Sequence, residues 1–177
     1  MFVNLNTLVP FLEEPSRKFH LREYARLQKI SPATAMSYLK VLVREGLVVR
    51  RKDRLYALFS GNTDSPAFVQ HKVFLTLSHI IASGVLQFLD RELAFPTVIL
   101  FGSGAKGEDL AGSDLDLFIL SNTKKELNLS AYEQKLKKNI QLFVMDDATF
   151  KKTVRSSPEL ANNIVNGIKL SGFLKVF

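Results

Sequence analysis

Positions 97–120 of this 177-residue chain, TVILFGSGAKGEDLAGSDLDLFIL, constrain the fold more than any other stretch. Two apolar runs flank a glycine-rich segment, and each run has the length and composition of a buried strand. The pattern predicts a strand over 97–101, a glycine turn at Gly102-Ser103 leading into a short helical piece, a loop over 107–112 and a second strand over 113–120.

The second predicted strand carries two carboxylates, Asp114 and Asp116. Side chains two residues apart on a strand share a face, so both carboxylates point the same way. Two close negative charges are unfavourable unless a cation lies between them, and hard oxygen ligands near phosphates favour Mg²⁺. Backbone N–H groups at Gly102 and Ser103, at the start of a helical piece, offer an anion site for a triphosphate.

The motif Gly102-Ser103, Gly107 and Ser113-Asp114-Leu115-Asp116-Leu117 resembles the DNA polymerase beta-type nucleotidyltransferases, particularly their minimal members, across roughly residues 67–177. The resemblance implies a two-metal transfer of a nucleoside monophosphate, with Mg²⁺ and with ATP or another NTP as substrate. It implies Asp114 and Asp116 as catalytic metal ligands. The nucleotide-contacting residues that it implies are Gly102, Ser103, Lys106 and Ser113.

The sequence departs from that family in two places. Minimal members often carry arginines in the glycine loop, whereas this loop reads GSGAKG and offers Lys106, a point charge without the bidentate fork of arginine. The family also has a third carboxylate on a later strand, and in the candidate strand over 138–145 the corresponding position is Gln141. An amide is neither a negative metal ligand nor a proton acceptor, so nucleotide binding is expected to survive this change better than transfer.

The first third of the chain has the pattern of a helix-turn-helix. A short helix is expected over 21–29, and Ser31 is a good N-cap for a second helix that begins at Pro32 and ends before Gly46. Ala35, Leu39, Leu42 and Val43 form the buried stripe of that second helix. An earlier amphipathic helix over 4–14 would complete a three-helix core.

Two short β-prone runs joined by a basic turn follow the second helix, as expected of a β-hairpin. Residues 1–60 thus resemble the winged helix-turn-helix family, in which the second helix of the pair enters the major groove and the wing reaches the phosphates. The alternative is that this winged helix serves protein contacts or dimerisation and does not bind DNA. The DNA-contacting residues implied by the resemblance are Ser31, Thr34, Ser37, Tyr38, Arg44, Arg50, Arg51, Lys52 and Arg54.

Turn residues over 60–66 predict a boundary between a winged-helix domain, residues 1–62, and a minimal nucleotidyltransferase domain, residues 63–177. The second domain is expected to open with one long helix over 67–91 and to continue into the core over 97–120. The fold class is therefore α/β (α+β), with a small mixed sheet flanked by helices. Residues 1–60 carry 11 Lys/Arg and 5 Asp/Glu, whereas the remainder carries 13 and 12, so the surplus positive charge lies in the first domain.

Composition excludes several classes of site. The chain has no cysteine, so disulfides, thiolate zinc sites and cysteine nucleophiles are absent, and its 3 histidines are scattered. The N-terminal residues lack the pattern of a signal peptide, and the apolar stretch over 73–89 is too short and too polar for a membrane span. A cytoplasmic location is expected.

Three functions fit these observations. The first is a Mg²⁺-dependent transferase that moves a nucleoside monophosphate to a hydroxyl. Some minimal nucleotidyltransferases modify a small helical HEPN-type partner protein, so such a partner is one expectation. The second is a DNA-binding transcriptional regulator whose transferase-like domain only binds nucleotide or dimerises; its partners are double-stranded DNA and a second copy of the chain. The third is a structural adaptor that uses neither site.

Overall fold

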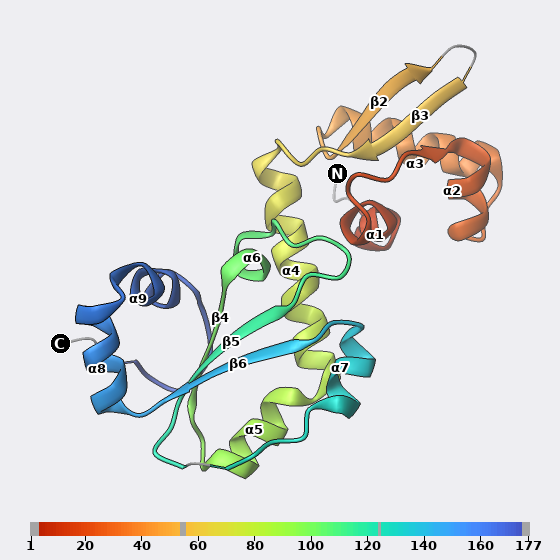
Figure 1. Ribbon diagram of the computed structural model, residues 1–177. Coiled ribbons are helices and arrows are strands. Elements are labelled where there is room, and N and C mark those ends of the chain that lie inside the picture. Colours follow the sequence, from red (N-terminus) through yellow and green to blue (C-terminus); the bar gives the residue numbers. More distant parts are fainter. Residues whose placement is uncertain (1–3, 54–55, 124, 175–177) are drawn as a thin grey trace. The chain divides into compact units, whose positions relative to one another are not determined.

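The computed structural model describes residues 4–53, 56–123 and 125–174 and divides the chain into two compact units, Met1–Leu75 and Thr76–Phe177 (Figure 1). The division falls inside helix α4 (Pro66–Ser83), beyond the turn-rich segment that marked the expected boundary at residue 62. The chain has the expected fold class: helices with a small antiparallel sheet come first, and a mixed four-stranded sheet flanked by helices follows.

In its described residues the first unit contains α1 (Leu5–Glu13), α2 (Leu21–Leu27), α3 (Pro32–Arg44), the beginning of α4, and a small sheet of β1 (Phe19–His20), β2 (Val48–Asp53) and β3 (Tyr56–Gly61). Helix α3 starts where its sequence predicts: the hydroxyl of Ser31 accepts a hydrogen bond from the N–H of Thr34 at 3.1 Å. Strands β2 and β3 pair as an antiparallel hairpin, and β1, too short to be visible in the sequence pattern, pairs with the other edge of β3.

The core of the first unit joins one face of each helix to the sheet. Ala35, Leu39 and Leu42 on α3 are buried as expected, and Val43 packs against them from the side. Burial raises the pKa of Tyr24 to about 12, and its hydroxyl donates to the carbonyl of Thr7 at 2.7 Å. The remaining buried members are Leu8, Phe11, Leu12, Phe19, Ala25, Leu47, Val48, Phe59 and Phe68.

The expectation of one uninterrupted helix over 67–91 is wrong. Helix α4 ends at Ser83, Gly84 adopts a left-handed conformation with φ of 83°, and α5 (Val85–Leu93) continues at an angle of 58°. The buried hydroxyl of Ser83 donates to the carbonyl of Ile80 and accepts from the N–H of Val85, which satisfies backbone groups that the break exposes. Within the described residues, no lone helix has the length and apolarity to cross a membrane; α4 and α5 reach that threshold only when taken together.

The second unit is built on a sheet of β4 (Thr97–Phe101), β5 (Leu115–Leu120), β6 (Ile140–Met145) and β7 (Ile168–Ser171) in the order β6-β5-β4-β7. Strands β5 and β6 are parallel, and the other pairs are antiparallel. The remaining helices are α6 (Gly102–Lys106), α7 (Ser130–Leu136), α8 (Asp147–Ser156) and α9 (Pro158–Val165).

The sheet has a helical layer on each face, with α5 and α7 on one side and α8 and α9 on the other (Figure 1). The alternation along β5 assigns its side chains to the two layers: Leu115, Leu117 and Ile119 pack with α5 and α7, whereas Phe118 packs with α8 and α9. Asp116 shares its face with Phe118, so it stands at the start of the strand on the side of α8 and α9.

Candidate active site

The turn between β4 and α6 is shaped around one carboxylate. Gly102 has φ of 69°, a conformation that favours glycine, and a Cβ placed there would lie 2.2 Å from Oδ2 of Asp116. Asp116 is paired across the sheet with Phe101, the residue just before this turn. The glycine therefore allows the carboxylate to stand directly against the backbone of the turn.

Asp114 and Asp116 lie close enough to influence each other. Burial raises the pKa of Asp116 above its ordinary value, and the charge of Asp114 raises it further. Asp116 is half-buried at the start of β5, whereas Asp114 is exposed just before the strand. Placing two carboxylates together at a partly buried position favours a bound cation over two free charges.

Asn139 contacts Asp114, a role that the sequence did not indicate. Its side-chain amide donates to Oδ1 of Asp114 at 3.1 Å, and its carbonyl accepts from the N–H of Leu115 at 2.8 Å. Asn139 lies directly before β6. Asparagine is common in loops, so its presence at this position gave no signal of a role.

Gln141 stands beside Asp116. In the parallel pairing of β5 and β6, Leu115 is opposite Ile140 and Asp116 is opposite Gln141. Gln141 is exposed, and it occupies the position at which the polymerase beta resemblance leads one to expect a carboxylate. Asp146 follows the opposite end of β6, where its side chain caps α8 by accepting from the N–H of Thr149.

The other sequence-predicted nucleotide contacts are spread along the glycine loop. Ser103 is half-buried in the first turn of α6, and Lys106 is exposed at its last position. The hydroxyl of Ser113 accepts from the N–H of Leu110 at 2.9 Å, so it closes the turn that precedes Asp114. The structure thus brings Gly102 into contact with Asp116, and it gives the Ser113 hydroxyl a structural partner.

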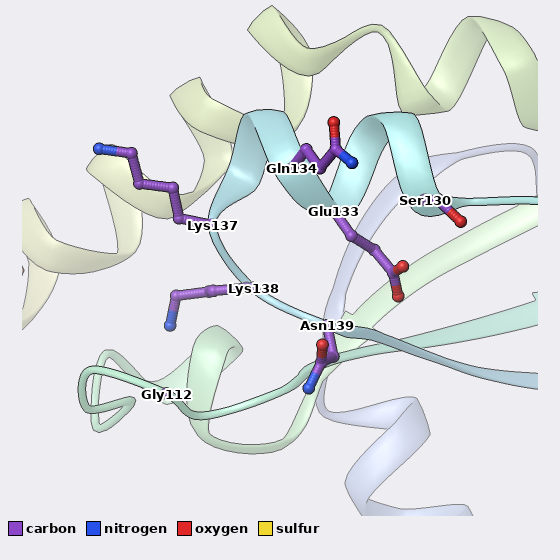
Figure 2. A pocket seen from close by; sticks show the side chains of 7 residues that line it. All are labelled: Gly112, Ser130, Glu133, Gln134, Lys137, Lys138 and Asn139. Carbon is purple, nitrogen blue, oxygen red and sulfur yellow. The ribbon is translucent and has the colours of Figure 1, made fainter.

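A cavity of about 380 Å³ lies beside this site, between α7 and the loop that carries Gly112 (Figure 2). Lys138 ion-pairs with buried Asp109 at 2.6 Å, and Glu133 accepts from the N–H of Ile140 at 2.9 Å. The full set of lining residues is Gly112, Ser130, Glu133, Gln134, Lys137, Lys138 and Asn139. Asn139 thus both lines the cavity and holds Asp114.

The two carboxylates fit a magnesium ion that binds together with a nucleotide. Nowhere in the described part of the chain do three Asp, Glu, His or Cys side chains gather as a metal-binding group. Mg²⁺ usually binds through one or two carboxylates together with substrate phosphates rather than through an all-protein cage. Asp114 and Asp116 meet that requirement, and the phosphates of a nucleotide would supply the rest.

The residues proposed for DNA contact lie on α3 and on the hairpin of the first unit. Ser31 and Thr34 are engaged with each other, since their hydroxyl oxygens lie 2.8 Å apart, and the hydroxyl of Ser37 donates to the carbonyl of Ala33. Arg44 forms an exposed ion pair with Glu45 at 2.9 Å. Tyr38 on α3 is also exposed, as are Arg50, Arg51 and Lys52 on β2. Arg54 lies outside the described residues.

Of three comparisons with known proteins, one gives a match to a family. Among solved structures, a candidate transcriptional regulator from Rhodococcus sp. RHA1 aligns at 14% identity over 73% of this chain and 49% of its own, with a TM-score of 0.31, too low to establish a common fold. The aligned part thus spans about half of that protein. A comparison with curated proteins finds no match. Residues 84–170, which contain the glycine turn, both carboxylates, Asn139 and Gln141, match the nucleotidyltransferase domain family. The similarity of this chain to the nucleotidyltransferase domain family is thus confined to residues 84–170 of its second unit.

Proposed function

We propose that the second unit binds a nucleoside triphosphate with Mg²⁺ and transfers its nucleoside monophosphate to a hydroxyl acceptor. The observation that carries this proposal is the placement of Asp116 directly against Gly102, with the charge of Asp114 near enough to raise the pKa of Asp116, inside a segment that matches the nucleotidyltransferase family. A pair of carboxylates at a glycine turn is suited to a nucleotide that arrives with its own cation.

In the proposed reaction the acceptor hydroxyl oxygen forms a bond to the α-phosphorus, and the proton of that hydroxyl passes to solvent. The bond from that phosphorus to the oxygen bridging to the β-phosphate breaks, and pyrophosphate leaves. Bound magnesium would neutralise charge on the phosphates as this exchange proceeds. From the protein, Asp114 and Asp116 would hold the cation, backbone N–H groups at Gly102 and Ser103 would bind phosphate oxygens, and Lys106 would add one positive charge.

Thermal unfolding tests the nucleotide site directly. We expect Mg·ATP to raise the melting temperature of the wild type, because a ligand at about a thousand times its Kd adds roughly 4 kcal/mol of stability. The Asp114→Asn/Asp116→Asn variant should lose that shift, since an amide cannot replace a carboxylate as a cation ligand. Equal shifts in both proteins would place the nucleotide elsewhere. No shift with any nucleotide would refute the proposed site.

Transfer itself is measured with α-labelled ATP and candidate hydroxyl acceptors, including a small helical protein partner of the HEPN type. Label that enters the acceptor together with released pyrophosphate supports the proposal. Label that appears equally with Asp114→Asn/Asp116→Asn would come from a contaminating enzyme.

A second candidate function is favoured by Gln141, which is opposite Asp116 on the neighbouring strand. Its amide cannot accept the proton that the acceptor hydroxyl must lose. In this second proposal the chain is a DNA-binding transcriptional regulator, and the second unit binds nucleotide or dimerises without transferring a group. Exposed Arg50, Arg51 and Lys52 on β2 support the DNA-binding part, since cations on a hairpin wing suit phosphate contacts.

Restoring a carboxylate separates the two candidates. If the native site is a nucleotide sensor, Gln141→Glu or Gln141→Asp should raise transfer from background by more than about a hundredfold, a rate gain typical of an added general base. If the native protein already turns over and these variants do not exceed it, the first candidate stands and Gln141 is no impediment.

A further inference from the structure

Two amides face the two carboxylates across the β5–β6 pair. The first paired residues of the two strands are Leu115 and Ile140, and Asp114 and Asn139 come directly before them. The next pair is Asp116 with Gln141. Asn139 contacts Asp114 directly through the 3.1 Å hydrogen bond. The first of these pairs, Asp114 with Asn139, is therefore held by an observed side-chain interaction.

Asn139 holds Asp114 in place through two hydrogen bonds, one made by its backbone with Leu115 and one made by its side chain with Asp114 itself. Its carbonyl accepts from the N–H of Leu115 at 2.8 Å, which anchors the backbone next to the carboxylate. Its side-chain amide donates to Oδ1, which limits the rotation of the carboxyl group. With Oδ1 held, Oδ2 is the oxygen of Asp114 that is left to face a cation.

We infer that Asn139 is a positioning residue, which orients Asp114 toward a cation that enters with the nucleotide. This inference rests on the proposed nucleotide site. An amide orients the carboxylate without adding negative charge, unlike an aspartate in the same place. The site thereby holds a divalent cation weakly by itself and acquires the missing negative ligands from the triphosphate.

A purely structural role for the same hydrogen bond makes a different prediction. If Asn139 only fastens the start of β6 to β5, its loss lowers the stability of the free protein and leaves nucleotide affinity unchanged. If it positions Asp114, its loss weakens the binding of Mg·ATP. Because Asn139 is exposed and its backbone hydrogen bond is retained on substitution, the stability of the free protein should change little.

The experiment measures the Kd of Mg·ATP by calorimetry and the melting temperature without ligand for the full-length wild type, Asn139→Ala and Gln134→Ala. Outer-shell partners of metal ligands are typically worth 10–100-fold in metal affinity, so we expect Asn139→Ala to raise the Kd of Mg·ATP about tenfold or more. Gln134 is the matched control. It lines the same cavity from α7, and its amide points away from Asn139 (Figure 2).

A third variant tests the charge argument with Mg²⁺ alone. Asn139→Asp places a third carboxylate beside Asp114, so we expect millimolar Mg²⁺ without nucleotide to raise its melting temperature more than that of the wild type. In the absence of metal, repulsion should make this variant less stable than the wild type.

The outcomes are separable. Weaker Mg·ATP binding in Asn139→Ala, with wild-type affinity in Gln134→Ala, supports the inference. Unchanged affinity in Asn139→Ala, or an equal loss in both variants, overturns it while leaving the nucleotide site in place. No binding of Mg·ATP by the wild type overturns the proposed site and the inference together.

Discussion

At the scale of single residues, Gly102 and Asp116 constrain each other at the turn between β4 and α6. A methyl group at position 102 would lie 2.2 Å from a carboxylate oxygen of Asp116, so that side chain would have to move, and the backbone there has φ of 69°. The polymerase beta resemblance singled out Gly102 from its motif. Only the structure shows that the residue which excludes a side chain there is Asp116.

We expect Gly102→Ala to cost about 1 kcal/mol of stability through its left-handed backbone and to abolish the Mg·ATP shift by displacing Asp116. Gly112→Ala is the matched control, because Gly112 has φ of 85° but nothing within 4 Å of its added Cβ. Denaturant unfolding with and without Mg·ATP compares the two. A retained nucleotide shift in Gly102→Ala would show that Asp116 does not need this clearance.

The raised pKa of Asp116 predicts a pH-dependent stability. Because burial and Asp114 raise the folded-state pKa above the unfolded-state value, folding favours the protonated carboxyl. The stabilisation is present below the unfolded-state pKa and is lost as the pH rises through the folded-state pKa. Asp116→Asn should therefore melt above the wild type at neutral pH without ligand.

Near pH ~3, where an aspartate is largely protonated, the two melting temperatures should converge. Thermal scans across the acidic range check this. A constant difference at every pH would assign the effect to packing rather than to ionisation.

At the scale of elements, the sequence predicted segments whose ends carry local chemical signals. Ser31 and Pro32 mark the start of α3, and Gly46 with φ of 70° follows its end. The break at Gly84 was missed because the apolar periodicity runs on through it. Strand β1 was missed because its pairing with β3 depends on residues far along the chain.

Two glycine substitutions in helical segments should act in opposite directions. Gly84→Ala should lose about 1 kcal/mol, because Gly84 is left-handed between α4 and α5. Gly104→Ala should gain about 0.5–1 kcal/mol, because Gly104 lies inside α6 and its added Cβ would meet its neighbours at 3.5 Å or more, an ordinary contact. Denaturant midpoints of the two variants measure both effects. A loss in Gly104→Ala would mean that α6 does not tolerate a methyl group facing Leu100 and Leu115.

At the scale of the whole molecule, fold class and motif placement were predictable, but the partners of the carboxylates were not. The strand-turn-strand pattern over 97–120 was sufficient to predict β4, α6 and β5. The proximity of Asp114 and Asn139 depends on strand register, which a single sequence does not specify for residues 25 positions apart. The position of Gln141 was inferred from family resemblance, not from the local pattern.

The uneven charge of the chain predicts where a polyanion would bind. If the first unit binds DNA, Arg50→Glu/Arg51→Glu should weaken binding to all sequences alike and reduce the slope of log K against log salt by about 2. Lys151→Glu/Lys152→Glu makes the same charge change on exposed α8 residues of the second unit and is the control. Titrations of labelled duplexes at several salt concentrations give both slopes. Equal effects of the two variants would indicate a general charge effect rather than contact through the wing.

The order of strands in the second sheet has a consequence for synthesis on the ribosome. Strand β4 pairs on one side with β7, and the hydroxyl of Thr97 donates to the carbonyl of Phe173. The first unit contains all its own core residues within its first 75 positions, so it can acquire its native contacts while later residues are still being translated. The second sheet must wait until residue 173 has left the exit tunnel. The nascent chain therefore presents a folded first unit joined to an incomplete sheet, whose apolar strand β4 is a natural target for chaperones.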